Sequence, residues 1–221
     1  MKILCPRLGD FDIRDRPAVL RAFSDAPVLE MVQGWRDQPE EHFLPAQVRV
    51  GWRDDRLLIL AELHDSVIVT RATADNQLLC LLGDVFEIFL RDPGADPYVE
   101  FHVAPNGKRL QLRYPDHLAI HEMNTGNLPF ERLTVAGSLF DFSLWTDENQ
   151  WSVCASVPAS SLIAKGSLLG GRTWLGSFSR YDYSSFEEPP VHSSTSPHAE
   201  LSFHRQHEWV ELHFVEPDPG S

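Results

Sequence analysis

The chain has 221 residues, a length typical of one all-β domain, and 43% of them are hydrophobic, which is enough to build a substantial core. Its formal net charge of −13 argues against a nucleic-acid-binding protein, because a phosphate footprint needs clustered lysines and arginines. The same charge argues against binding to an anionic membrane surface.

The first 25 residues mix charged with apolar side chains, which favours an ordered extension or a first strand. The apolar run at the start is too short for a signal peptide, and no segment is long and apolar enough to span a bilayer. We therefore expect a cytoplasmic protein, or a secreted one if a leader has been removed. Three widely spaced cysteines (Cys5, Cys80 and Cys154) provide neither a disulfide framework nor metal-site spacing.

Strands dominate the first half of the chain. Apolar and polar residues alternate with a period of two over residues 47–52, 83–90, 98–103 and 108–114. A continuous apolar run at 57–61 predicts a strand that is covered on both faces. Asn106 and Gly107 form the strongest short hairpin signal in the chain. They predict that the third and fourth alternating strands pair directly.

Three of these strands offer an unusual set of polar side chains. Glu87 shares a face with Val85 and Phe89, while Tyr98, Glu100 and His102 share a face of the next strand. Gln111 and Arg113 alternate with apolar residues on the third strand. A sheet commonly buries one face and offers the other to water or a ligand. A hydroxyl-rich ligand suits this set of side chains, which contains carboxylates, an imidazole, an amide and a guanidinium.

The second half of the chain predicts further short strands and almost no helix. We expect a loop over 115–129, strands over 130–142, 151–157, 174–180 and 208–214, and a long polar loop over 182–200. Many short strands with turn signals between them predict an all-β fold. We expect an antiparallel β-sandwich, with an immunoglobulin-like or jelly-roll-like two-sheet architecture. Residues 1–221 would form a single domain with a core at about 25–214.

The order of these motifs resembles the family 9 carbohydrate-binding modules. Six pieces match in order, although no single piece is specific. They are Val48 to Ala61 with Asp65 after it, Gly83 to Leu90 with an aspartate followed by a glutamate, Tyr98 to Gly107, Trp151 to Pro158, Trp174 to Asp182, and Phe203 to Phe214. The resemblance covers residues 25 to 214 and implies a non-catalytic domain that binds a mono- or oligosaccharide.

In sugar-binding members of that family, two tryptophans sandwich a sugar ring, and a glutamate and an arginine hydrogen-bond it. Glu87 matches the glutamate, and His102 stands about where the arginine does. Leu81 stands near the position of the first tryptophan, and residues 190–200 hold no aromatic for the second. Calcium also occurs in the family and stays an alternative here, but the sequence offers no ligand set for it, so we expect no cofactor and no metal site.

The candidate ligand-binding residues extend beyond this pair. We place the site on the polar sheet face and predict that it contains Glu87, His102, Arg113, Arg180, Tyr181 and Tyr183. Carboxylate and guanidinium groups would hold pairs of hydroxyls by charge-assisted hydrogen bonds, and the tyrosines would cover the sugar ring. The alternative is that Glu87 forms a structural ion pair with Arg113 or Arg180.

Other function classes remain open at this point. A repurposed sandwich that binds a protein or another small ligand is the main alternative, and it predicts a flat or loop-filled face with an exposed apolar patch. Glycoside hydrolysis by Glu87 and Glu100 ranks third. Haem binding through Met123 and a histidine has no supporting motif. Five histidines lie in the last third of the chain, but their spacing matches no familiar metal site.

Overall fold

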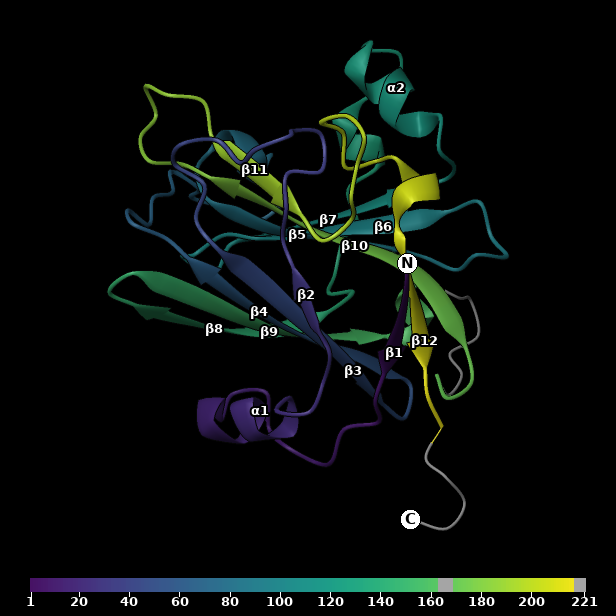
Figure 1. Cartoon of the computed structure of the whole chain (residues 1–221). Coiled ribbons are helices and arrows are strands. Elements are labelled where there is room, and N and C mark those ends of the chain that lie inside the picture. Colours follow the sequence, from purple (N-terminus) through teal and green to yellow (C-terminus); the bar gives the residue numbers. More distant parts are fainter. Residues whose placement is uncertain (163–168, 217–221) are drawn as a thin grey trace.

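The computed structural model describes residues 1–162 and 169–216, which form two β-sheets packed face to face (Figure 1). The larger sheet contains, in spatial order, β1 (Lys2–Cys5), β12 (Val210–Phe214), β10 (Thr173–Asp182), β5 (Val85–Arg91), β6 (Tyr98–Val103) and β7 (Arg109–Tyr114), with β11 (Val191–Ser194) paired to β10. The smaller sheet contains β2 (Val28–Glu30), β3 (Ala46–Arg53), β4 (Arg56–His64), β9 (Gln150–Pro158) and β8 (Asp141–Asp147). The predicted β-sandwich is confirmed.

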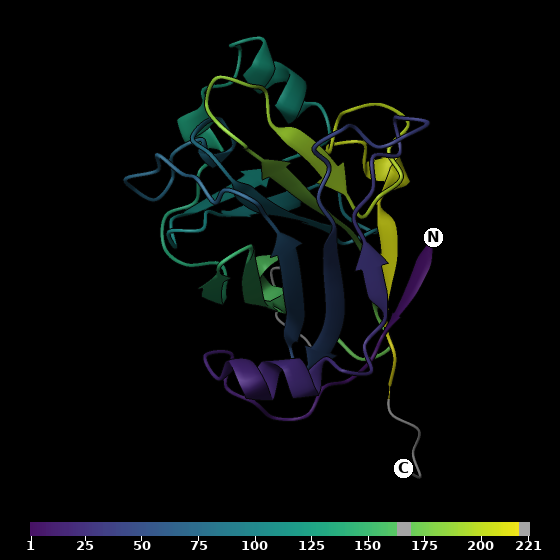
Figure 2. The same cartoon turned by 60° about the vertical axis from the view of Figure 1, so that its left-hand side comes forward.

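Helix is scarce, as expected. The described residues contain two short α-helices and four 3₁₀ turns: α1 (Arg16–Ala22), α2 (Ala119–Asn124), η1 (Leu79–Leu81), η2 (Phe130–Arg132), η3 (Ala159–Ser161) and η4 (Gln206–Glu208). The two α-helices lie on opposite sides of the sandwich (Figure 1, Figure 2). Helix α1 packs through Val19 and Phe23 on the outer face of the smaller sheet. None of the helices in the described ranges is long and apolar enough to cross a membrane.

The strands pair antiparallel, apart from the parallel pair β1 and β12. The predicted Asn106-Gly107 hairpin joins β6 to β7. Gly107 has a φ of +80°, a conformation that glycine adopts without steric cost, and its amide donates to the Ala104 carbonyl at 2.9 Å. This turn fixes the register in which His102 faces Leu110 and Glu100 faces Leu112.

The inner faces of the two sheets form the main core. Alternate residues of β5 and β6 point into it, with Phe86, Ile88 and Leu90 from β5 and Phe101 from β6, all fully buried. Because side chains alternate along a strand, this placement directs Val85, Glu87 and Phe89 to the outer face of the larger sheet.

The outer face of the larger sheet is covered over much of its area. Leu110, Leu112 and Tyr114 of β7 belong to a second apolar cluster, together with Tyr98 and Trp209. Helix α2, turn η1 and residues 199–209 lie over this face (Figure 1). The expectation of an open polar face is therefore wrong. The apolar side chains on this face need to be covered from water, so these segments pack on them and close most of the face.

Three predicted elements differ from the structure. The expected loop over 115–129 contains α2, and the expected strand over 130–142 becomes η2 followed by irregular chain, with β8 starting only at Asp141. The expected loop over 182–200 contains β11, which pairs with the end of β10. These segments are short, and tertiary pairing decides their conformation more than local pattern does.

Candidate functional site

A cleft of about 320 Å³ opens over the centre of the larger sheet. Glu87 and Phe89 of β5 and Glu100 and His102 of β6 line its floor. Its walls come from turn η1, helix α2, strand β10 and residues 202–204, and include Leu81, Met123, Tyr181, Phe203 and His204. The structure therefore brings Glu87, His102 and Tyr181 together, as the sequence predicted.

The polar floor is built by strand register. Glu87 and His102 lie opposite each other on β5 and β6, and Glu100 lies two residues before His102 on the same face. His102 Nε2 lies 3.2 Å from Glu87 Oε1 and also makes a close contact with Glu100 Oε1. One imidazole nitrogen therefore joins two carboxyl groups, all of them nearly excluded from water.

Burial sets the protonation of this group. Burial raises the pKa of Glu87 to about 8, with the charge of Glu100 adding to the effect and His102 opposing it. Burial alone would lower the pKa of His102, but the carboxylates of Glu87 and Glu100 raise it above its usual value. Of the two carboxyl groups, Glu87 and Glu100, Glu87 is therefore the one that holds a proton near neutral pH. It can donate as well as accept a hydrogen bond.

Glu100 is held as the charged member. Burial would raise its pKa, but the neighbouring imidazoles of His204 and His102, and the hydrogen bond with His102, lower it below its usual value. His204 Nε2 lies 3.7 Å from Glu100 Oε2, and His204 Nδ1 lies 3.0 Å from the Tyr98 hydroxyl. Both oxygens of Glu100 therefore face imidazole groups.

Aromatic rings form part of the cleft wall. Tyr181 is half-buried and lies edge-on to Phe203 at 5.7 Å and to His192 at 4.5 Å between ring centroids. Phe89 and Phe203 are buried, and Leu81 at the rim is 67% exposed. Tyr181 is thus the most accessible aromatic ring of the cleft, and Leu81 offers an apolar edge in open solvent.

Arg113 and Arg180 lie outside this cleft. Arg113 pairs with Val99, whose side chain enters the main core, so it lies on the opposite face from Glu87; its Nη2 donates to the Ser161 carbonyl at 2.7 Å. Arg180 is 1% exposed, and its Nη2 lies 2.7 Å from Asp182 Oδ2 and 3.6 Å from Asp65 Oδ2. Neighbouring residues on a strand point to opposite faces, so Arg180 and Tyr181 cannot share one.

Tyr183 has a supporting position instead. Its hydroxyl donates to the Cys80 carbonyl at 2.7 Å, and its amide donates to Asp84 Oδ1 at 2.7 Å. These bonds tie the end of β10 to turn η1, which forms one wall of the cleft. The predicted ion pair of Glu87 with Arg113 or Arg180 is wrong, because His102 takes that place.

Phe203, His204 and Met123 line the cleft, although they are not among the residues predicted for the site. They lie in segments that reach the cleft only when the chain folds over the sheet, so no local pattern identifies them. Glu100 lies on the face that its alternation with His102 predicts, although it is not among the predicted ligand-binding residues.

Within residues 1–162 and 169–216, two groups of side chains have donor atoms close enough for a metal ion: Cys80, Glu87 and His102, and Asp65, Asp84 and Asp182. In the first, Glu87 and His102 already satisfy each other, and burial raises the pKa of the Cys80 thiol far above its usual value. In the second, the guanidinium of Arg180 lies 2.7 Å from Asp182 and 3.6 Å from Asp65 and balances part of the negative charge. The expected absence of a metal site stays a prediction.

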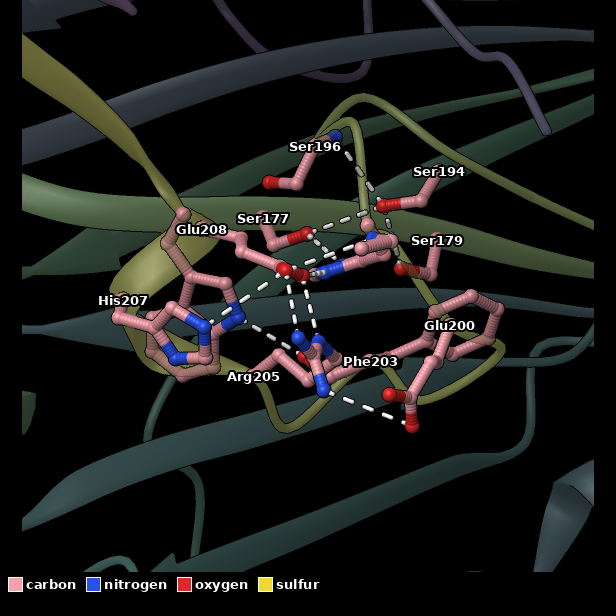
Figure 3. Close-up of polar contacts among 12 residues, drawn as sticks. Ser177, Ser179, Ser194, Ser196, Glu200, Phe203, Arg205, His207 and Glu208 are labelled. Atoms are coloured by element: carbon pink, nitrogen blue, oxygen red, sulfur yellow. Dashed lines mark hydrogen bonds and ion pairs between the residues drawn. The ribbon is translucent and has the colours of Figure 1, made fainter. Parts of the chain in front are cut away.

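A polar clamp holds the segment that carries Phe203 and His204 (Figure 3). His198 Nδ1 lies 3.0 Å from Glu208 Oε2, and Arg205 donates to both oxygens of Glu208 at 2.8 Å. His198 Nε2 lies 3.5 Å from Ser177 Oγ, which also contacts Ser194 at 3.1 Å. This order resembles a serine–histidine–acid relay, but Ser177 and His198 are both 0% exposed, so the clamp is structural.

The comparisons with known proteins rest on structure alone. No protein-family profile and no curated protein matches the sequence. Among solved structures, the fold is similar to that of a candidate carbohydrate-binding protein from Bacteroides uniformis, with 16% identity and a TM-score of 0.74 over 96% of this chain and 98% of that one.

Two further similar structures are a family 9 carbohydrate-binding module from Caldicellulosiruptor kristjanssonii, solved with cellotriose and with glucose. The cellotriose complex is 14% identical, with a TM-score of 0.65 over 100% of this chain and 97% of that one. The glucose complex is 12% identical, with a TM-score of 0.66 over 100% and 99%. The chain therefore has the β-sandwich fold of the family 9 carbohydrate-binding modules, as the order of its sequence motifs predicted.

Proposed function

We propose that this protein is a non-catalytic saccharide-binding module whose ligand lies in the cleft over Glu87 and His102. The observation that carries the proposal is a hollow with a hydrogen-bonding floor and partly aromatic walls. Its volume of about 320 Å³ lies at the small end of ligand pockets and suits a short saccharide. The fold is shared with modules that have been solved with cellotriose and glucose.

The chemistry of the cleft supports a hydroxyl-rich ligand. A protonated Glu87 carboxyl group donates one hydrogen bond and accepts others, which matches two neighbouring sugar hydroxyls. Tyr181 and Phe203 offer apolar ring surface to the C–H face of a sugar. The stacking tryptophans of the resembled family are replaced here by smaller contacts, so we expect weak binding.

The floor geometry favours binding over glycoside hydrolysis. A hydrolase needs two carboxyl groups on opposite sides of a glycosidic bond, separated by about 5 Å or more. Here Glu87 and Glu100 are both engaged by the same His102 nitrogen, within one buried group. We therefore expect no release of reducing sugar from any polysaccharide.

The test is titration calorimetry with glucose, xylose and their β-linked oligomers at millimolar concentration. Glu87→Ala and Tyr181→Ala should each weaken binding several-fold, whereas Glu30→Gln, an exposed glutamate on β2 of the other sheet, should not. Leu81→Trp should strengthen binding by up to about tenfold, because it restores an aromatic ring at the rim. No binding by the native protein and none by Leu81→Trp would overturn the proposal.

A further inference from the structure

A second cleft, of about 390 Å³, adjoins the first and has a different character. Its lining consists of Arg91, His117, His204, Arg205, Gln206 and His207. Two guanidinium groups, three imidazoles and one amide converge from β5, the loop before α2 and the 204–207 segment. None of these lining residues carries a carboxylate, although the chain has a net charge of −13.

Arg91 supplies the unbalanced charge. Its Nη1 donates to Gln206 Oε1 at 2.7 Å, and no carboxylate among the described residues forms an ion pair with it. Arg91 Nε and Gln206 Nε2 are both buried without a hydrogen-bond acceptor. A buried donor without an acceptor is costly, and such groups are rare in folded proteins. The pair therefore has donor capacity that the protein itself does not use.

Arg205, His204 and His207 each have a partner outside the lining of this cleft. Arg205 contacts Glu208 at 2.8 Å and Glu200 at 3.6 Å, and His207 lies 3.6 Å from Glu208. His204 faces Glu100, as described above. These carboxylates hold Arg205, His204 and His207. Arg91 is therefore the guanidinium whose charge is available to a ligand.

His204 lines both clefts, so a ligand in one lies next to the other. We propose that the Arg91 cleft is a subsite for an acidic substituent, a carboxylate, sulfate or phosphate, on the saccharide bound over Glu87. A neutral hydroxyl would satisfy a donor but leave the charge of Arg91 unbalanced, whereas an anion accepts from the planar guanidinium and balances its charge. The inference rests on the proposed function for the position of the sugar ring.

Matched ligands test the subsite. The affinity for glucuronic acid, glucose 6-sulfate and glucose 6-phosphate is compared by calorimetry with that for glucose. At least one acidic sugar should bind about tenfold more tightly than glucose, and the difference should shrink as sodium chloride is raised. The identity of the preferred acidic sugar distinguishes carboxylate from sulfate and phosphate.

Arg91→Gln should bring the ratio of acidic to neutral affinity close to one, while Arg21→Gln, on α1 at the opposite side of the sandwich, should leave that ratio unchanged. Thermal unfolding of each variant checks that it is folded. Should Arg91→Gln fail to fold, competition of sodium sulfate against the preferred acidic sugar in the native protein replaces it, and sulfate should displace that sugar.

The outcomes separate the two proposals. Equal affinity of the native protein for glucose and all three acidic sugars overturns the subsite and leaves the proposed function standing. Stabilisation by sulfate that Arg91→Gln abolishes, without binding of any sugar, keeps an anion site and overturns both its saccharide ligand and the proposed function. An acidic preference that persists in folded Arg91→Gln assigns the anion to other residues and overturns the role of Arg91.

Discussion

Glu87 illustrates how the sheet changes the chemistry of a single residue. It is 2% exposed, and its carboxyl group shares His102 with Glu100. Its neutral form is the one that suits both burial and hydrogen bonding to hydroxyls. A carboxylate that would be charged on the surface is therefore expected to keep its proton here near neutral pH.

This protonation predicts a pH dependence of stability. The pKa of Glu87 rises from 4.5 in the unfolded chain to about 8 in the folded protein, so the folded state binds more protons in this interval. Stability therefore falls as pH rises from about 5 to about 8. Glu87→Gln does not titrate, and we expect it to remove about 3–4 kcal/mol of this fall.

The measurement is the free energy of unfolding in urea at a series of pH values. The native protein keeps further contributions of the same sign, because burial raises the pKa of Asp84 to about 7 and that of Asp182 to about 6. The difference between native protein and variant reports the titration of Glu87 together with that of His102, whose pKa Glu87 raises. Glu30→Gln is the control, and parallel curves for native protein and Glu87→Gln would contradict the prediction.

At the scale of single elements, the 198–208 segment is the part on which both clefts depend. It carries Phe203 and His204 to the first cleft and His204, Arg205, Gln206 and His207 to the second. The His198–Glu208–Arg205 clamp joins the two ends of this segment, and His198 Nε2 lies 3.5 Å from Ser177 Oγ on β10 (Figure 3). The polar contacts of the clamp therefore help to set the positions of the side chains that line the two clefts.

Loss of this clamp should loosen the segment. His198→Ala removes a fully buried imidazole and leaves Glu208 with Arg205 as its main partner, so we expect about 1–3 kcal/mol lower stability. Hydrogen exchange over residues 199–209 should accelerate more than exchange in β5 and β6. His64→Ala, at an exposed histidine that ends β4 of the other sheet, is the control. Unchanged exchange in His198→Ala would show that the clamp does not hold the segment.

The alternation of side chains between the two faces of a strand explains which site residues the sequence identified. Glu87, Glu100 and His102 follow from a period of two and a hairpin at Gly107, both visible in the sequence. Arg113 and Arg180 do not lie on the cleft face. On β7 the apolar residues Leu110, Leu112 and Tyr114 point outward into the second cluster, so Arg113 points inward, and Arg180 lies next to Tyr181, which is on the cleft face. The structure assigns both to the inner side of the larger sheet.

At the scale of the whole molecule, the inter-sheet core determines stability. Phe101 is fully buried and stacks on Phe140 with ring centroids 4.6 Å apart. Phe101→Ala removes a large ring from a packed interior and should cost about 3–5 kcal/mol. The same deletion at half-buried Phe142, on edge strand β8, should cost clearly less. Urea unfolding measures both, and equal costs would contradict the assigned core.

The sequence by itself determined the sandwich and the central polar pair. Hydrophobic alternation and turn chemistry are local properties, so they fix which residues form β5, β6 and β7 and which face carries Glu87 and His102. The order of motifs along the chain also matched the fold that the structural comparisons show.

Only the tertiary structure decided that this face is a cleft rather than an open platform. Helix α2, turn η1 and residues 199–209 are distant in sequence and have weak local preferences, so their positions follow from what they cover. The cationic cleft around Arg91 also forms only when separate segments pack over the sheet. Side chains from separate segments meet there only because burying the apolar outer face of the sheet brings those segments together.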